Sequence, residues 1–295
     1  MIQKYFNQTY RKSNRIETKL TTIFLTGGSS GIGRAIALRL ANKGFRVFAA
    51  GRSVKRLRSL KEEAESNGYT ITPVRLDLDD PDSMTMIQEE FGDQKVIVDV
   101  LINNAAFGVW GPLETLSDEK LRAQFETNIF GLMSLTRLLL PSIKLSSHGK
   151  IINVSSVLGR FGTPFNGAYV ASKFALEGLS ESLRIELSAF NVGVTVVEPG
   201  LFDTNFSKNQ VDGTFLSEAL SPYHDYIKGY RGRKNTYSRP GNPEQVAKTI
   251  EKIIDSKHPK FRYIVGKDAK IALVLKNIIP EKIFAYFLRR ITMGK

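Results

Sequence analysis

Residues 21–33 read TTIFLTGGSSGIG, and this stretch decides the fold. Its first five residues form a short apolar, β-prone run, and residues 34–40 continue with helical periodicity. A strand, a glycine-rich turn and a helix in this order are typical of dinucleotide binding. Glycine lets the backbone approach a pyrophosphate closely, and the helix N-terminus offers free N–H groups. A tight turn alone would not explain three glycines spaced G-x-x-x-G-x-G and flanked by Thr26 and two serines.

Apolar β-prone runs and helical patterns alternate along most of the chain. Such alternation predicts βαβ units, and right-handed crossovers then favour a parallel sheet with helices on both faces. We therefore expect an α/β fold with a single doubly wound Rossmann-type parallel sheet, which 295 residues, 42% of them hydrophobic, can fill. The expected strands are residues 23–25, 46–50, 70–75, 98–102, 150–154 and 193–197, and the expected helices are residues 32–43, 54–66, 81–91, 118–144 and 168–189.

Tyr169 and Lys173 lie four residues apart in the run YVASK, so a helix would place them on one face. A phenol titrates near ~10 in model peptides, and a neighbouring ammonium favours the phenolate. This pairing predicts an acid/base group that works near neutral pH. The pair alone is weak evidence, because many such pairs only cover a helix surface.

With these motifs together, the chain resembles the short-chain dehydrogenase/reductase family over roughly residues 20–205, in particular NADP-dependent members with basic C-terminal extensions. The family carries T-G-x-x-x-G-I-G at its cofactor turn, N-N-A-G after the fourth strand and a catalytic Asn-Ser-Tyr-Lys set. This chain departs from it at Ala106, where a glycine is expected. The resemblance implies that Asn128, Ser156, Tyr169 and Lys173 are catalytic, with Ser155 a weaker alternative to Ser156.

The same resemblance implies a role for each catalytic residue. Tyr169 would give a proton to a carbonyl oxygen or take one from an alcohol, and Ser156 would hydrogen-bond that oxygen. Lys173 would stabilise the phenolate and hold the nicotinamide ribose. Asn128 would serve a water-mediated proton relay, or it would be a buried amide at a helix bend, and the two are compatible.

The choice of cofactor is expected at the end of the second strand. An acidic residue there would bind the ribose of NAD, whereas an arginine accommodates the 2′-phosphate of NADP. The chain has Arg52 and Ser53 and no acid, which favours NADP (NADPH), and Lys55 and Arg56 could assist. Together with the family motifs, the expected cofactor-binding residues are Thr26, Gly27, Ser29, Ser30, Gly31, Ile32, Gly33, Arg52, Ser53, Asp77, Asn104, Ala105, Tyr169, Lys173, Pro199, Gly200 and Thr204.

The net charge of +13 is unevenly distributed. Residues 1–20 hold 5 Lys/Arg against 1 Asp/Glu, and residues 227–295 hold 17 against 5, whereas residues 21–226 hold 20 against 23. We expect a basic N-terminal extension at 1–20, a Rossmann-fold oxidoreductase domain at 21–266 with a substrate flap at about 205–245, and basic amphipathic helices at 267–295. No nucleic-acid motif accompanies the basic ends, so an anionic membrane or a phosphorylated substrate group is at least as plausible a partner.

Two apolar stripes, separated by Pro280, run along the C-terminal segment. Basic amphipathic helices of this kind either lie on a bilayer or pack onto the substrate cleft or a second subunit, and we favour packing. The first stripe is Ile271, Val274, Leu275 and Ile278, and the second is Phe284, Phe287, Leu288 and Ile291.

Several other classes of site are disfavoured. The chain has no cysteine, its three histidines are scattered, and we expect no metal site. There is no apolar leader and no run near the ~18 residues of a membrane span, so we expect a cytoplasmic protein, with or without peripheral membrane association.

The predicted activity is NADP(H)-dependent hydride transfer to or from a carbonyl or a primary or secondary alcohol, in a homodimer or homotetramer. A lipophilic substrate of the steroid, retinoid, sphingoid or fatty-acyl type is favoured by aromatic residues near the expected cleft. Two alternatives remain: a 3-oxoacyl-thioester reductase, and a non-catalytic NADP-binding regulator, which the intact Ser-Tyr-Lys set disfavours. The residues expected to line this cleft are Phe107, Val109, Trp110 and Phe161 from loops at the carboxyl ends of the strands, and Phe206, Phe215, Tyr223, Tyr226 and Tyr230 from the expected flap.

Overall fold

Seven parallel strands form the central sheet of the chain. The computed structural model describes residues 20–92, 96–204, 206, 210–214, 222–237 and 240–293, with the backbone alone for 231–237. The sheet has the order β3-β2-β1-β4-β6-β7-β9, which confirms the predicted doubly wound Rossmann-type fold. The strands are β1 (Thr22–Thr26), β2 (Arg46–Gly51), β3 (Ile71–Arg75), β4 (Val100–Asn103), β6 (Lys150–Val154), β7 (Gly193–Pro199) and β9 (Arg262–Val265).

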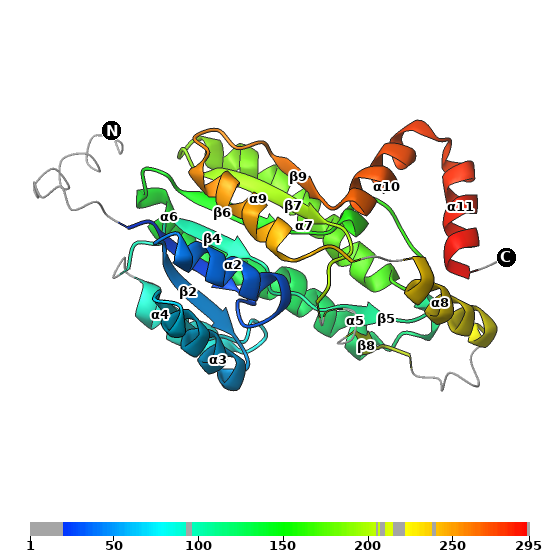
Figure 1. The fold of residues 1–295 in the computed structure, drawn as a ribbon, viewed down its shortest axis with the longest axis horizontal. Coiled ribbons are helices and arrows are strands. Elements are labelled where there is room, and N and C mark those ends of the chain that lie inside the picture. The colour runs from blue at the N-terminus through cyan, green and yellow to red at the C-terminus, as the bar shows by residue number, and fades with distance from the viewer. Residues whose placement is uncertain are drawn as a thin grey trace, which may run out of the picture.

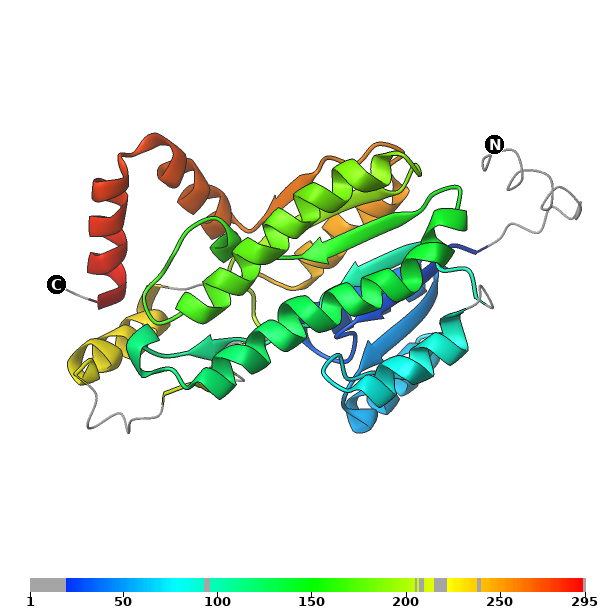
Figure 2. The ribbon, with the colours of Figure 1, turned by 180° about the vertical axis from the view of Figure 1, so that it is seen from behind.

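Helices cover both faces of this sheet, because successive strand residues point to opposite sides. Ile23 and Leu25 of β1 belong to one core cluster and Phe24 to the other. In Figure 1, α2 and α9 lie in front of the sheet, and Figure 2 shows two long helices, α6 and α7, across the opposite face. The first core is covered by α2 (Gly31–Asn42), α3 (Val54–Ser66) and α9 (Glu244–Asp255), the second by α4 (Pro81–Phe91), α6 (Leu132–Leu145) and α7 (Gly167–Ser188).

The helix expected over residues 118–144 is present but contains a π-helical segment. It comprises α5 (Asp118–Phe125), the π-helix η3 (Glu126–Gly131) and α6. A Cβ at Gly131 would lie 2.4 Å from the carbonyl oxygen of Leu78, so the helix can approach that loop only with glycine there. Single π-turns inside α-helices occur frequently at functional sites, and this one contains Asn128.

The carboxyl ends of the strands carry the elements outside the main sheet. A short parallel pair joins two loops there, and α8 follows it. The expected flap at about 205–245 is described only in part, and Phe215 lies outside the described residues. These elements are β5 (Val109–Trp110), η2 (Leu113–Thr115), η4 (Val157–Gly159), β8 (Val211–Asp212) and α8 (His224–Tyr237).

The C-terminal segment forms two helices, α10 (Lys267–Ile278) and α11 (Glu281–Met293), with Pro280 directly before the second. Figure 1 shows them as a V-shaped helical hairpin beyond the end of the sheet, with α8 beside α11. Leu273 and Phe284 are buried against Val157 and Phe161, so the hairpin packs onto the rest of the fold. The first apolar stripe, however, faces outward, with Ile278 76% exposed. Within the described residues, no helix is long and apolar enough to cross a bilayer.

Candidate active site

The glycine-rich turn lies at the carboxyl end of β1, between strands β2 and β4. Gly27 has a φ of 64°, in the left-handed region that favours glycine. A Cβ at Gly33 would lie 2.0 Å from the carbonyl oxygen of Gly27, so the turn closes onto α2 only with glycine at this position. The turn therefore exposes its backbone at the point where the strand order reverses, which is where ligands bind in open α/β sheets.

Thr26 and Asn104 tie the turn to β4. The Thr26 hydroxyl accepts hydrogen bonds from the N–H groups of Asn104 (2.9 Å) and Ala105 (3.0 Å). The Asn104 side-chain amide donates in return to the carbonyls of Thr26 (3.1 Å) and Gly27 (3.3 Å). These two residues thus hold the shape of the turn, and a direct cofactor contact by either stays a prediction.

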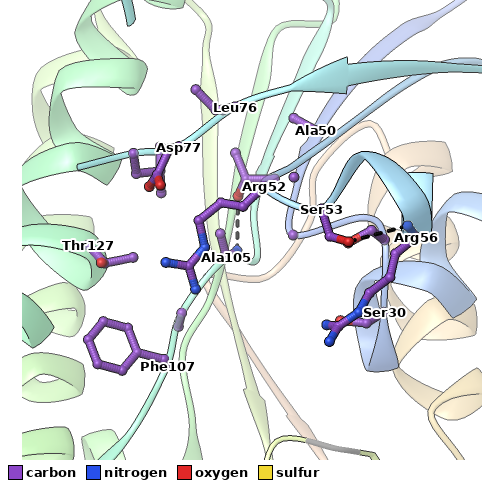
Figure 3. A pocket seen from close by; sticks show the side chains of 16 residues that line it. Ser30, Ala50, Arg52, Ser53, Arg56, Leu76, Asp77, Ala105, Phe107 and Thr127 are labelled. Atoms are coloured by element: carbon purple, nitrogen blue, oxygen red, sulfur yellow. Dashed lines mark hydrogen bonds between the residues drawn. The ribbon is translucent and has the colours of Figure 1, made fainter. Parts of the chain in front are cut away.

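A cavity of about 310 Å3 opens beside this turn, and Figure 3 shows the residues around it. Arg52 and Arg56 both line it, and neither has an ion-pair partner among the described residues. Ser53 is the N-cap of α3 and accepts the Arg56 N–H, so its hydroxyl is already engaged with the backbone. Lys55, the other expected helper, does not line the cavity.

The cavity brings together about half of the expected cofactor residues. An anionic, adenosine-sized group fits this donor set, because serine hydroxyls and two guanidinium groups border a space that the glycines leave open. Arg56, named above as a possible helper, and Phe107, named among the aromatic residues, also line it, whereas Thr127 was not singled out from the sequence. The expected cofactor residues that line it are Thr26, Gly27, Ser29, Ser30, Arg52, Ser53, Asp77 and Ala105.

The remaining expected cofactor residues lie elsewhere around the turn. Thr204 lies against Gly31, where an added Cβ would be 3.2 Å from the threonine Cβ. Gly200 leaves room for the Asp268 carboxylate of α10, which accepts the Leu201 N–H at 2.7 Å. The segment from Pro199 onward is thus anchored to the start of the C-terminal helices, and the sequence did not predict this link.

Tyr169 and Lys173 lie on the same face of α7, as predicted. Both are buried, and the Lys173 ammonium is 5.7 Å from the centre of the Tyr169 ring. Burial raises the pKa of Tyr169 to about 12, and the hydroxyl of Ser156 opposes the rise. Desolvation is thus the largest influence on this phenol, and the lowering of its pKa by Lys173 stays a prediction.

Lys173 lies close to a buried acidic pair, Glu177 and Glu198. Its ammonium donates to the carbonyl oxygen of Val154 at 2.9 Å, and burial lowers its pKa to about 8 while Glu177 opposes the fall. The Arg262 Nε is 3.1 Å from Glu177 Oε2 and 3.2 Å from Glu198 Oε1. Sequence reasoning missed this cluster; the spacing of Glu177, one turn after Lys173, was the available signal.

Asn128 is fixed by the backbone of the loop after β4. Its amide oxygen accepts the Phe107 N–H at 3.1 Å, and its amide nitrogen donates to the Phe107 carbonyl at 3.0 Å and to the Ser172 hydroxyl at 3.1 Å. The interpretation of a buried amide at a helix irregularity agrees with the π-helix around it. No direct contact joins Asn128 to Lys173 among the described residues, so the relay through water stays a prediction.

Two groups of aromatic side chains, which we together call the aromatic wall, lie at Tyr169 and around Phe165. The Phe206 ring is 5.4 Å from the Tyr169 ring, and Phe165 contacts Trp110 at 5.8 Å and Tyr230 at 5.6 Å between ring centres. Phe165 has a φ of 63°, a conformation that is costly for a bulky residue. This strained residue is at the centre of the second aromatic group and lies four residues before Tyr169 in the chain.

The sequence of the chain is similar to those of known proteins. A family described as short chain dehydrogenase matches residues 21–214. Retinol dehydrogenase 8 of Bos taurus is 36% identical to the chain over 270 residues, which are 88% of this chain and 86% of that protein. The 3-ketodihydrosphingosine reductase of Bacteroides thetaiotaomicron is 33% identical over 272 residues, which are 90% of this chain and 96% of that protein.

Solved structures agree. A short-chain dehydrogenase from Streptomyces avermitilis has a TM-score of 0.76 at 30% identity, with 92% of this chain and 96% of the other covered. An alcohol dehydrogenase from Thermococcus sibiricus, complexed with 5-hydroxy-NADP, has a TM-score of 0.67 at 26% identity, with 84% and 96% covered. The chain therefore belongs to the short-chain dehydrogenase/reductase family and is an oxidoreductase that acts on alcohol or carbonyl groups.

Proposed function

We propose that this oxidoreductase uses NADP(H) rather than NAD(H). Arg52 follows directly after β2, where NAD-dependent Rossmann proteins carry an acid that binds the ribose 2′-hydroxyl. Arg52 and Arg56 bring two guanidinium groups to the same cavity, with no described carboxylate paired to either. Charge-assisted hydrogen bonds from guanidinium to phosphate are short and strong. The Thermococcus sibiricus relative, complexed with 5-hydroxy-NADP, supports the same choice.

The chemistry follows from the buried phenol. Bound NADP(H) supplies the hydride. Tyr169 is protonated at neutral pH because burial raises its pKa to about 12, so its hydroxyl can give a proton to a carbonyl oxygen. Ser156 donates a hydrogen bond to the same oxygen, where negative charge develops. Lys173, charged below about pH 8, would stabilise the phenolate that remains and would hold the nicotinamide ribose.

We further propose a lipophilic substrate, and the observation that carries this proposal is the aromatic wall beside Tyr169. Phe206 contacts the Tyr169 ring, and Trp110 packs with Phe165, which lies four residues before Tyr169 in the chain. Large apolar surfaces next to a few polar groups are typical of sites for apolar small molecules. The two relatives, whose names specify retinol and 3-ketodihydrosphingosine, suggest long-chain alcohols or ketones.

A turnover screen tests both parts of this function. Purified protein would be mixed with NADPH or NADH and a panel containing a long-chain 3-keto sphingoid base, retinal, a ketosteroid and a 3-oxoacyl thioester. We expect oxidation of NADPH in preference to NADH, with a lipophilic aldehyde or ketone. Preference for NADH would contradict the cofactor assignment, and turnover of the thioester alone would favour the acyl-thioester alternative.

Assembly and location remain proposals. The homodimer or homotetramer expected from the family would appear as a multiple of the 33.0 kDa chain mass in light scattering. The cytoplasmic location also stays a prediction, and peripheral contact with an anionic membrane is argued below from the C-terminal helices.

A further inference from the structure

The C-terminal helices present an apolar face that no described residue covers. We call it the outer face of the hairpin formed by α10 and α11. A monomeric protein rarely exposes so many large apolar side chains together, and such patches mark protein or membrane contacts. The outer face consists of Ile271, Val274, Leu275, Ile278, Ile283, Tyr286, Phe287 and Ile291, each at least 44% exposed.

The outer face is separate from the face that packs on the body. In α10, Ala269 and Leu273 are buried, whereas Ile271, Val274 and Ile278 lie on the opposite side of the helix. In α11, Phe284 is buried against Phe161, with ring centres 5.4 Å apart. Helix α10 is thus apolar on two sides, whereas α11 has one broad apolar side on which Phe284 is buried and Phe287 and Ile291 are exposed, so folding of this chain covers only part of the apolar surface.

The hairpin is also basic. Residues 267–293 hold 6 Lys/Arg against 2 Asp/Glu, and none of the six has an ion-pair partner among the described residues. One of the two acids, Asp268, already accepts the Leu201 N–H. A second copy of the same face would bring like charges together, whereas an anionic surface would neutralise them.

We propose that the outer face of the hairpin binds the surface of an anionic lipid bilayer. Amphipathic helices with basic and aromatic residues lie in the membrane interface, and each basic residue near an anionic surface adds to the attraction. The inner face of the hairpin packs on Val157 and Phe161, close to Ser156 in the chain. Binding would therefore hold the substrate side of the enzyme at the membrane, which suits the lipophilic substrate proposed above, although the binding itself does not depend on that function.

Co-sedimentation with vesicles tests this proposal on the full chain. Vesicles of phosphatidylcholine mixed with phosphatidylglycerol should carry the protein into the pellet, vesicles of phosphatidylcholine alone should carry much less, and added salt should release it. The double substitution Ile278→Glu with Phe287→Glu should weaken binding by more than about tenfold, because it removes apolar contacts and adds repulsion.

Matched controls distinguish binding by the outer face from a general effect of changing surface charge or removing an exposed apolar side chain. Ile185 on α7 is 75% exposed, close to the 76% of Ile278, so Ile185→Glu should leave vesicle binding unchanged. Lys282→Glu with Arg289→Glu should weaken binding, whereas the same exchange at Lys248 and Lys252, which are exposed on α9, should not. Thermal unfolding and NADPH binding would verify that each variant is folded.

Three outcomes would overturn the proposal. The wild-type protein could ignore anionic vesicles, or the α7 and α9 controls could weaken binding as much as the hairpin variants. Light scattering without lipid could also show an oligomer that the Ile278 and Phe287 substitutions dissociate, which would make the outer face a subunit interface. Each result is independent of turnover, so failure here leaves the proposed activity untouched.

Discussion

The positive charge of Lys173 is disfavoured by burial and favoured by the nearby Glu177. Burial lowers its pKa to about 8, and Glu177 limits the fall. Below that pH the ammonium is present and can stabilise the Tyr169 phenolate, and above it the charge is lost. We expect kcat/KM for carbonyl reduction to decline as the pH rises through about 8.

Glu177→Gln should move that decline to lower pH. The substitution removes the anion that favours charged Lys173, so the lysine pKa falls further. Glu181, an exposed partner of Arg262, is the matched control, and Glu181→Gln should leave the profile in place. The measurement is kcat/KM against pH for the wild type and both variants. A profile unmoved by Glu177→Gln, or moved equally by both substitutions, would show that Glu177 does not influence Lys173.

Arg52 is the residue on which the choice of cofactor depends. Arg52→Ala should weaken NADPH binding roughly tenfold or more and leave NADH binding nearly unchanged, since a hydrogen bond to a charged group is typically worth about 1.5–3 kcal/mol. Arg56→Ala should act in the same direction. Arg58→Ala is the control, because Arg58 is exposed on α3 but does not line the cavity. Titration of nucleotide fluorescence gives each Kd, and equal weakening of both nucleotides would contradict the assignment.

At the scale of elements, the side chain of Asn128 connects the π-helix η3 to the loop after β4. Asn128 satisfies both the N–H and the carbonyl of Phe107, and it is almost fully buried. Asn128→Ala would leave the Phe107 N–H without a partner, at a cost of about 1–3 kcal/mol, and would leave the Phe107 carbonyl only the longer hydrogen bond from Gln124 at 3.4 Å. We expect a clear fall in Tm together with loss of turnover, measured by thermal unfolding and the NADPH assay. An unchanged Tm would show that the π-turn does not need this amide.

The main strands and helices could be predicted because their apolar periodicity is strong. The expected strand at 150–154 and helices at 54–66 and 81–91 match the structure residue for residue. The π-segment could not be predicted, since one extra residue per turn hardly changes the pattern over six residues. β9 was also missed, because its residues are only partly buried and include Arg262.

The candidate site also has a part that the sequence predicts and a part that it does not. Motifs local in sequence, such as the glycine turn and the Tyr169–Lys173 pair, were predictable from spacing. Contacts between distant segments were not: Arg262 meets Glu177 across 85 positions, and Asp268 reaches Leu201 across 67. Their partners are determined by strand order, which brings β7 and β9 together beside α7. The outward direction of the first C-terminal stripe likewise depends on which side of α10 meets the body.

At the scale of the whole molecule, the sheet places three functions at one end. The cofactor cavity, the Tyr169 site and the C-terminal hairpin all lie at the carboxyl ends of the strands, where the loops after β1, β2, β3, β4, β6 and β9 meet. This arrangement links the chemistry to the hairpin through Ser156 and its neighbours Val157 and Phe161. The proposed reduction of a carbonyl group requires that the phenol of Tyr169 be the proton donor.

The most direct test is the turnover of Tyr169→Phe with NADPH and the best carbonyl substrate of the panel. Only a hydroxyl is removed from a buried ring, so the fold, measured by Tm, and the Kd for NADPH should remain close to wild type. General acid catalysis typically contributes about 10²–10⁴-fold to the rate, and we expect kcat to fall by about 10²-fold or more. A folded variant that binds NADPH and turns over at the wild-type rate would contradict the account.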